Sequence, residues 1–211
     1  MSVRSLQLDP PLEPSPSKPA DSLTTDLTGN AAADPLAVWR AALADEAAFE
    51  RWYRSVVPRV YAFLLARCGH DVELAEELTQ RTFVAAIESR WRFDGRSDPV
   101  TWLCAIARHR LADHFRARDR EERRRLHVEV SELAIAGETP RLEAIDEREA
   151  VARAFRSLPA AQQAVLAFVV FDDLSVAEAG RLLGKSAGAT SSLLHRAREG
   201  FRQAHAREGG R

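Results

Sequence analysis

Four side chains near the C-terminus could hydrogen-bond to the edges of DNA bases. Ser191, Ser192, His195 and Arg196 fall on one face of an expected helix within LSVAEAGRLLGKSAGATSSLLHRARE, residues 174–199. Lys185 and Arg198 lie close by in the sequence and could contact phosphates. The pattern predicts a helix-turn-helix with its turn at residues 184–186. The packing of a small helical domain produces a similar pattern, so the motif alone leaves both interpretations open.

A second set of side chains combines an aromatic ring with cations. Trp102, His109 and Arg116 follow one another at seven-residue steps. They lie opposite an apolar arc made of Val100, Leu103, Cys104, Ile106, Ala107, Leu111 and Phe115. An exposed tryptophan in line with cations suits a surface that stacks on bases and contacts phosphates. The alternative is that Trp102 packs under the preceding loop.

A third expected helix, within VELAEELTQRTFVAAIES, carries acidic and apolar side chains on its outer face. Its inner stripe is Leu74, Ala75, Leu78, Thr82, Ala85 and Ala86, and the opposite face carries Glu76, Gln80, Phe83 and Ile87, flanked by Glu73 and Glu77. Such a strip is typical of contact with a protein that presents basic residues. A helix sandwiched between two others would show the same pattern.

Two other residue pairs could support different chemistry. His70 and Asp71 are adjacent, as in a metal-hydrolase dyad, but further ligands are absent at plausible places and Asp71 suits a helix cap. Cys68 and Cys104 lie in apolar helical patterns, so we expect buried thiols rather than a disulfide or a metal site. We predict no metal, cofactor, catalytic residue or small-molecule substrate.

The elements that must position these side chains all have helical periodicity. Apolar residues recur at helical steps from Ala48 to about Gly69, and further helices are expected to begin after Asp71, at Pro99 and after the Ser175–Glu178 capping box. Ser186 is the expected cap of the last helix, whose inner arc is Thr190, Leu193, Leu194, Ala197, Phe201 and Ala204. We predict an all-α fold with two small helical domains at residues 40–118 and 143–211, joined by a flexible linker at 119–142. Residues 1–35 are predicted to be a disordered tail.

Charge is segregated along the chain behind a net charge of −1. Residues 90–125 carry eleven arginines against six acids, and residues 181–211 carry seven bases against two acids. Between them, residues 126–150 carry two bases against seven acids. Local basic blocks of this kind favour binding to a polyanion. We expect neither a membrane span nor a secretory signal, because no apolar run reaches the roughly 18 residues that a span requires.

Three stretches, by their order and spacing, resemble the extracytoplasmic-function sigma factors, the two-domain promoter-specificity subunits of bacterial RNA polymerase. DVELAEELTQRTFVAAI at 71–87 is similar to the family's region 2.2, and RFDGRSDPVTWLCAIARHRLADHFR at 92–116 to regions 2.3 and 2.4. SLPAAQQAVLAFVVFDDLSVAEAGRLLGKSAGATSSLLHRAREGFR at 157–202 is similar to region 4. The resemblance covers residues 48–205, and His109 stands where the family usually has asparagine.

The resemblance implies a role for each set of side chains. Core polymerase would contact Glu76, Glu77, Gln80, Phe83 and Ile87. The minus-ten element would be read and melted by Phe93, Gly95, Arg96, Ser97, Trp102, His109 and Arg116. The minus-thirty-five element would be read by Lys185, Ser191, Ser192, His195, Arg196 and Arg198.

The resemblance also implies partners and a place in the cell. The partners would be promoter DNA, core RNA polymerase through its largest-subunit coiled coil and its flap, and an anti-sigma factor. The protein would be a non-enzymatic initiation factor for a stress or signal regulon. It would be cytoplasmic, where an anti-sigma factor could hold it at the inner membrane face. The alternative is a one-component regulator that binds DNA through residues 174–202 and senses a ligand or dimerises through its first domain.

Overall fold

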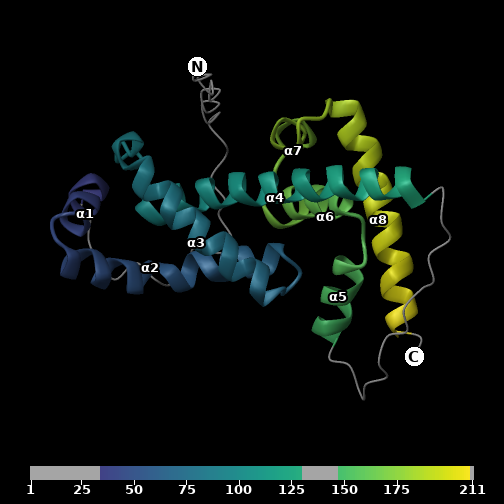
Figure 1. The fold of residues 1–211 in the computed structure, drawn as a ribbon, viewed down its shortest axis with the longest axis horizontal. Helices are drawn as coiled ribbons and strands as arrows, with labels where there is room; N and C mark the ends of the chain where they lie inside the picture. Colours follow the sequence, from purple (N-terminus) through teal and green to yellow (C-terminus); the bar gives the residue numbers. More distant parts are fainter. Residues whose placement is uncertain (1–33, 130–146, 210–211) are drawn as a thin grey trace. The chain divides into compact units, whose positions relative to one another are not determined.

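The computed structural model describes residues 34–129 and 147–209, which within these ranges form helices and no strands. The helices are α1 (Pro35–Ala42), α2 (Glu46–Arg67), α3 (Val72–Glu88), the 3-10 turn η1 (Arg90–Arg92), α4 (Pro99–Glu129), α5 (Glu147–Arg156), α6 (Ala160–Leu166), the π-helical turn η2 (Ala167–Phe171), α7 (Val176–Leu183) and α8 (Ala187–Gly209) (Figure 1). The prediction of an all-α fold is confirmed. Over the described ranges, none of these helices has the length and apolarity needed to cross a membrane.

Helix caps that were read from the sequence are present at three helix starts. The Asp71 carboxylate accepts a hydrogen bond from the Leu74 N–H at 3.0 Å, and Ser175 and Glu178 form a reciprocal capping box at α7. The Ser186 hydroxyl accepts from the Ala189 N–H at 3.3 Å at the start of α8. Each cap satisfies a backbone donor that has no partner within its own helix, so these starts are fixed by local sequence.

Helix α1 lies in a segment that the sequence prediction divided between the tail and the first domain. Asp34 caps this helix, and Trp39 is 2 % exposed in the core. The first domain therefore begins at α1 rather than at residue 40. The rest of the predicted tail, residues 1–33, lies outside the described residues.

Helix α4 extends to Glu129, so the predicted start of the linker at residue 119 is wrong. The segment DREERRR is rich in good helix formers, and ion pairs at helical spacing join Arg123 to Asp119 at 3.1 Å and Arg125 to Glu121 at 3.3 Å. Such exposed pairs add only a few tenths of a kcal/mol each. A tertiary contact adds to them, because the Glu122 carboxylate accepts from the Ala160 N–H at 3.0 Å at the start of α6. Residues 130–142 of the predicted linker lie outside the described residues.

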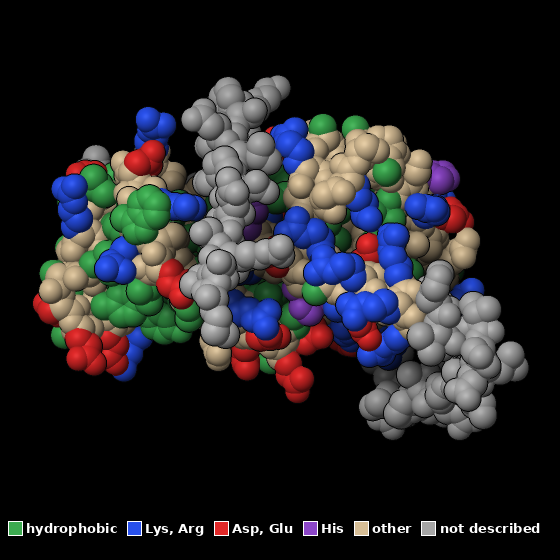
Figure 2. Space-filling view, turned by 45° about the horizontal axis from the view of Figure 1, so that its top comes forward, with side chains coloured by type: hydrophobic (Ala, Val, Ile, Leu, Met, Phe, Trp, Pro, Cys, Tyr) green, Lys and Arg blue, Asp and Glu red, His purple; other side chains and the backbone are tan. Residues whose placement is uncertain are grey.

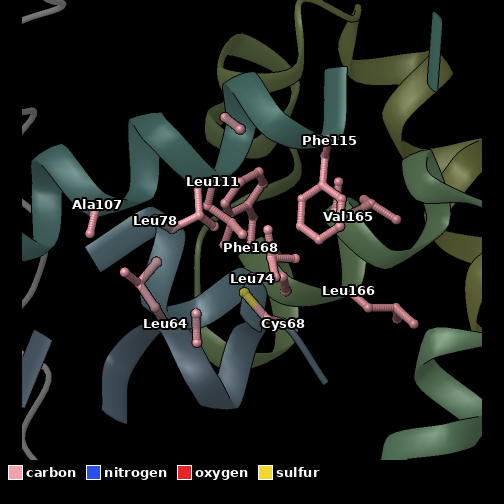
Figure 3. Packing of buried hydrophobic residues seen from close by; sticks show 14 of the residues in the cluster. Leu64, Cys68, Leu74, Leu78, Ala107, Leu111, Phe115, Val165, Leu166 and Phe168 are labelled. Atoms are coloured by element: carbon pink, nitrogen blue, oxygen red, sulfur yellow. The ribbon is translucent and has the colours of Figure 1, made fainter. Parts of the chain in front are cut away.

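The core is continuous around α4, which packs against α2, α3, α6 and α7. We call α1–α4 the N-terminal part and α5–α8 the C-terminal part. Both contribute to one cluster of buried apolar side chains. Figure 3 shows Leu111 and Phe115 of α4 pointing toward Phe168 and Val165, and all four are at most 1 % exposed. One long helix thus provides the surface on which both parts pack.

Candidate functional site

Helices α7 and α8 form the predicted helix-turn-helix. Gly184 ends α7 with a φ of 64°, a left-handed conformation that glycine adopts without strain. At Gly180, a Cβ would lie 2.8 Å from both the Lys185 carbonyl oxygen and the Thr190 hydroxyl, so the two helices approach closely there. The predicted inner arc is confirmed in its first half, where Thr190, Leu193, Leu194 and Ala197 are buried, while Phe201 and Ala204 further along are partly buried.

The opposite face of α8 is polar and open to solvent. Ser191, Ser192, His195, Arg196 and Arg198 are all exposed, as the sequence predicts. Figure 2 shows Lys and Arg side chains gathered over the part of the molecule where Figure 1 places α7, α8 and the C-terminal half of α4. This face therefore offers hydroxyl, imidazole and guanidinium groups on one rigid helix. These groups suit base edges in a major groove.

Lys185, in the turn before α8, is placed differently from the other five. It is partly buried, and its ammonium lies 3.5 Å from the Asp119 carboxylate of α4. Its positive charge is therefore already balanced by a carboxylate from the N-terminal part.

Trp102 and Phe93 belong to an aromatic cluster with Trp39, so Trp102 is not the exposed ring that the helical pattern predicted. The ring centroid of Trp39 lies 5.4 Å from that of Trp102 and 5.8 Å from that of Phe93. Phe93 is 5 % exposed and Trp102 is partly buried. The alternative in which Trp102 packs under the preceding loop is correct. Helix α1, which was not predicted, supplies the ring that covers both.

The loop between η1 and α4 keeps other groups at the surface. Arg96 is exposed and lies 3.2 Å from the Asp94 carboxylate, and Ser97 is partly buried. Gly95 has a φ of 76°, and a Cβ there would come within 2.8 Å of the Leu36 Cβ, so this position requires glycine. Just before the loop, Trp91 is 74 % exposed, with the Arg92 guanidinium 4.8 Å from its ring centroid. The sequence prediction missed Trp91, although an aromatic residue outside any apolar stripe was the available signal.

His109 and Arg116 lie on α4 as predicted, in different surroundings. His109 is exposed, and partial desolvation lowers the pKa of its imidazole from 6.5, against the opposing effect of Asp113. The imidazole is thereby favoured in its neutral form at pH 7. Arg116 donates to the Asp113 carboxylate and, at 2.9 Å, to the Leu182 carbonyl of α7. The Arg116 guanidinium therefore already donates hydrogen bonds to two acceptors of the same chain.

The outer face of α3 is acidic and apolar, with one exception to the prediction. Glu76, Glu77, Gln80 and Ile87 are exposed. Phe83 is only 5 % exposed, because its ring packs against Tyr53 and Trp52 of α2 with centroids 4.6 and 6.2 Å apart. The helix is thus covered on two sides. A groove between α3 and α4 is lined by Gln80, Arg81, Val84, Ala85, Glu88, Arg110 and Asp113.

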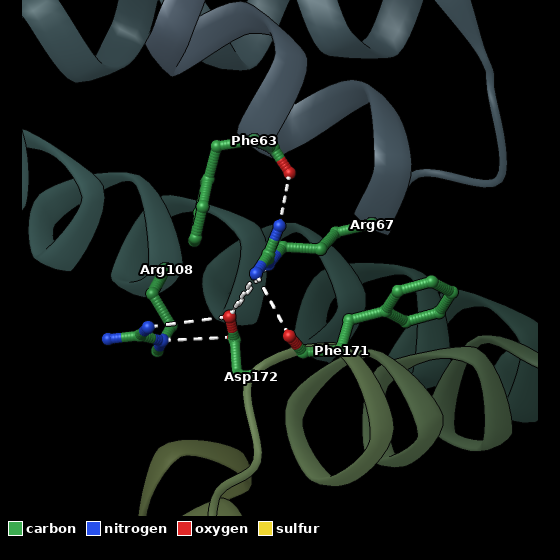
Figure 4. Close-up of polar contacts among 5 residues, drawn as sticks. All are labelled: Phe63, Arg67, Arg108, Phe171 and Asp172. Atoms are coloured by element: carbon green, nitrogen blue, oxygen red, sulfur yellow. Dashed lines mark hydrogen bonds and ion pairs between the residues drawn. The ribbon is translucent and has the colours of Figure 1, made fainter. Parts of the chain in front are cut away.

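An ion-pair cluster that the sequence prediction missed joins the two parts of the chain (Figure 4). The Asp172 side chain is 0 % exposed, and its carboxylate lies 2.6 Å from the Arg67 guanidinium and 2.9 Å from that of Arg108. Arg67 also donates to the carbonyls of Phe63 and Phe171, at 2.7 and 3.1 Å. We call Asp172, Arg67 and Arg108 the Asp172 cluster. No sequence signal pairs residues so far apart along the chain.

Asp71, Cys68 and Cys104, the other side chains that could be reactive, contribute to the structure of the helices. The Asp71 carboxylate caps α3, which is the role the sequence favoured over a metal dyad with His70. Cys68 is buried, and burial raises the pKa of its thiol to about 12. Cys104 is partly buried, and desolvation raises the pKa of this thiol as well. Neither thiol is a ready nucleophile at neutral pH.

Comparison with known proteins gives two family matches and several relatives. The Sigma-70 region 2 model matches residues 52–121, and the Sigma-70 region 4 model matches residues 148–199. The chain is 35 % identical to the ECF RNA polymerase sigma factor BldN of Streptomyces coelicolor over 76 % of this chain and 61 % of BldN. It is 32 % identical to the ECF RNA polymerase sigma factor SigF of Caulobacter vibrioides over 72 % of this chain and 83 % of SigF.

Among solved structures, the sigma factor RpoE of Bartonella quintana, crystallised with the anti-sigma factor NepR, matches 74 % of this chain and 95 % of RpoE. That match has a TM-score of 0.45 at 22 % identity.

Proposed function

Because the chain belongs to the extracytoplasmic-function sigma factors of RNA polymerase, we propose which of its surfaces read the promoter and which contacts core polymerase. This family membership explains the helix-turn-helix, so the alternative of a one-component regulator is set aside. The assignments below follow from which predicted side chains are exposed and which are buried.

The polar face of α8 reads the minus-thirty-five element. Ser191, Ser192, His195 and Arg196 are exposed in the first half of the helix, which is the half that a recognition helix places against base edges. Arg198 is also exposed and suits a phosphate contact. This exposed face, on a helix whose other face is buried, is the observation that carries the proposal.

The loop after η1 and the outer face of α4 read the minus-ten element. Arg96 and His109 are exposed, and Arg116 becomes available if its contact with α7 is released. Trp91 takes the stacking role that the sequence assigned to Trp102, since its ring is open to solvent and arginines flank it. Trp102, Phe93 and Gly95 instead hold the loop in place. Melting by capture of an unstacked base costs only a few kcal/mol, which binding can offset without ATP.

The acidic and apolar strip of α3 contacts core polymerase. Glu76, Glu77, Gln80 and Ile87 are exposed there, and Val84, which is 55 % exposed, extends the strip. Phe83 supports the strip from inside. A partner surface with basic residues, such as the coiled coil of the largest subunit, fits this chemistry.

The other partners and the setting are part of the proposal. In two solved complexes of related proteins, RpoE is bound to the anti-sigma factor NepR and BldN is bound to RsbN. We propose that this chain is likewise held by an anti-sigma factor and acts in the cytoplasm. We further propose that it acts by binding alone, without catalysing a reaction of its own.

Transcription in vitro with core polymerase on genomic fragments tests the proposal, with start sites mapped at base resolution. We expect His195→Ala and Arg196→Ala each to weaken binding to the upstream element by about 1–3 kcal/mol, as for a direct base contact. Arg207→Ala, exposed at the far end of the same helix, is the matched control and should change binding little. Equal losses on random DNA would show that the two side chains hold phosphates only.

A further inference from the structure

Helix α1 contacts both the turn and the loop that carry side chains of the proposed minus-ten surface. The Trp39 Nε1–H donates to the Arg90 carbonyl of η1 at 3.4 Å. In the loop that follows η1, a Cβ at Gly95 would lie 2.8 Å from the Leu36 Cβ, so the backbone of the loop lies against the first turn of α1. Helix α1 precedes residue 52, where the match to Sigma-70 region 2 begins. These contacts are therefore made by a part of the chain that lies outside the family match.

The turn η1 has few interactions of its own. The Arg92 N–H donates to the Ser89 carbonyl at 2.9 Å, and the Phe93 N–H donates to the Arg90 carbonyl at 3.4 Å. Within the described chain, none of the three residues of η1 is buried. A 3-10 turn also has poorer hydrogen-bond geometry than an α-helix. The Arg90 carbonyl, which accepts from both Phe93 and Trp39, is therefore a point at which tertiary structure holds the turn.

Trp39 is itself held on several sides. It is 2 % exposed, and its ring centroid lies 5.0 Å from that of Trp52 on α2 and 5.4 Å from that of Trp102 on α4. The Asp34 carboxylate accepts from the Leu36 N–H at 3.0 Å and so caps α1. This cap matters because a helix of eight residues is marginal by itself. Trp39 thus connects η1 to the core of the N-terminal part.

Resting on the proposed reading of the minus-ten element, we infer that α1 is a positioning element of that surface and that Trp39 is its main positioning residue. Trp39 does not touch DNA. Its indole fixes the carbonyl of the residue before Trp91, and Leu36 limits the path of the loop that carries Arg96. A ring and a guanidinium that are held in place before binding lose less conformational entropy when they bind an unpaired base. Loss of the α1 contacts leaves Trp91 and Arg96 in the chain and slows strand opening.

The test uses the full chain with Trp39→Phe, which keeps a ring in the cluster and removes the Nε1–H donor. Trp52→Phe is the matched control, because the Trp52 ring packs against Trp39 in the same cluster and its other ring contacts are in α2 and α3. Hydrogen–deuterium exchange of the free chain should be faster at the Arg92 and Phe93 amides of Trp39→Phe. The expected factor is roughly two- to tenfold, as for the loss of one hydrogen bond. The control should exchange there as the wild type does, and the amides of α8 should be unchanged in both variants.

The functional measurement is the rate at which thymines of the minus-ten element become reactive to permanganate. It is made with core polymerase at saturating protein, so that opening is separated from binding. Trp39→Phe should open the promoter roughly two- to tenfold more slowly, with unchanged binding to the upstream element. A purely structural role of Trp39 would instead lower binding and opening together. Trp52→Phe should open the promoter at the wild-type rate.

Unchanged exchange of η1 in a folded Trp39→Phe variant would overturn the inference, as would faster exchange with an unchanged opening rate. If circular dichroism shows that Trp39→Phe has lost its helices, Asp34→Ala replaces it, because it removes the exposed cap of α1 and no core side chain. Its control is Asp45→Ala, which removes the exposed cap of α2. No difference between these two variants in exchange of η1 or in opening rate would then overturn the inference.

The inference and the proposed function fail in different measurements. Exchange needs neither DNA nor polymerase, so it shows whether α1 holds η1 even if the chain reads no promoter. A normal opening rate in Trp91→Ala would contradict the proposed stacking role, whereas slow opening in Trp91→Ala with normal opening in Trp39→Phe would contradict the positioning role alone.

Discussion

At the residue scale, Trp91 and Trp102 differ in what surrounds their rings. Trp91 is 74 % exposed in η1, whereas Trp102 packs between Trp39 and Phe93. An exposed ring can stack on an unpaired base, and a ring held in a cluster of three cannot turn outward without breaking that cluster. Truncation of Trp91 should therefore impair strand opening and leave stability unchanged, whereas truncation of Trp102 should lower stability.

We expect Trp91→Ala to leave the free energy of unfolding within about 0.5 kcal/mol of the wild type, because it removes no buried contact. It should nevertheless reduce the permanganate reactivity of thymines in complexes with core polymerase and promoter DNA. Trp102→Ala should lower the free energy of unfolding by about 2–3 kcal/mol, somewhat less than for a fully buried ring. Normal permanganate reactivity in Trp91→Ala would contradict the stacking role, and chemical denaturation measures the stability of both variants.

At the element scale, the helix-turn-helix depends on how closely α7 can approach the start of α8. The Cβ position of Gly180 faces the Lys185 carbonyl and the Thr190 hydroxyl, both at 2.8 Å. The Thr190 hydroxyl donates to the Ser186 carbonyl at 2.8 Å, so it is held in place and cannot easily move aside. Glycine in the middle of α7 is therefore required by packing, despite its low helix propensity.

We expect Gly180→Ala to lower the free energy of unfolding by about 1–3 kcal/mol through overpacking. Gly188→Ala is the matched control, because nothing lies within 4 Å of its Cβ position. By helix propensity alone the control should gain up to about 1 kcal/mol. Thermal or urea unfolding measures both variants, and a stabilised Gly180→Ala would show that the two helices have room to separate.

At the scale of the whole molecule, one core serves both parts. Leu111 and Phe115 of α4 share a buried cluster with Val165 and Phe168, and the Asp172 cluster adds ionic contacts at the same seam. Domains that share a core unfold together, whereas domains linked only by a flexible chain unfold separately.

We expect the wild type to unfold in a single transition. All four tryptophans lie in the N-terminal part, so their fluorescence follows that part, while far-ultraviolet circular dichroism follows the helices of both. The two signals should change at the same urea concentration. In Asp172→Asn they should separate, because the seam loses its ionic contacts. Separate transitions in the wild type would show that the shared core contributes little to cooperativity.

Local patterns predicted helices α2, α3, α4, α7 and α8, their caps at Asp71, Ser175 and Ser186, and the polar face of α8, but not α1. Asp71, Ser175 and Ser186 cap because a side-chain oxygen meets a backbone N–H within three residues, and no distant contact is needed. The inner arcs of α4 and α8 follow from helical periodicity in the same way. The family was also readable from the order and spacing of three stretches of sequence.

Tertiary structure decided which of the predicted outward side chains meet solvent. Phe83 is covered by α2, and Phe93 and Trp102 are covered by a ring from α1, because a helix in a bundle packs on more than one side. The length of α4 was likewise set in part by contacts with α6 and with the turn that precedes α8. The Asp172 cluster joins residues that are 105 and 64 positions apart. Helical periodicity describes each helix by itself, so the sequence alone determined which side of a helix is apolar and which is polar. Only the tertiary structure decided which of these sides other helices cover, because that depends on residues far apart in the sequence.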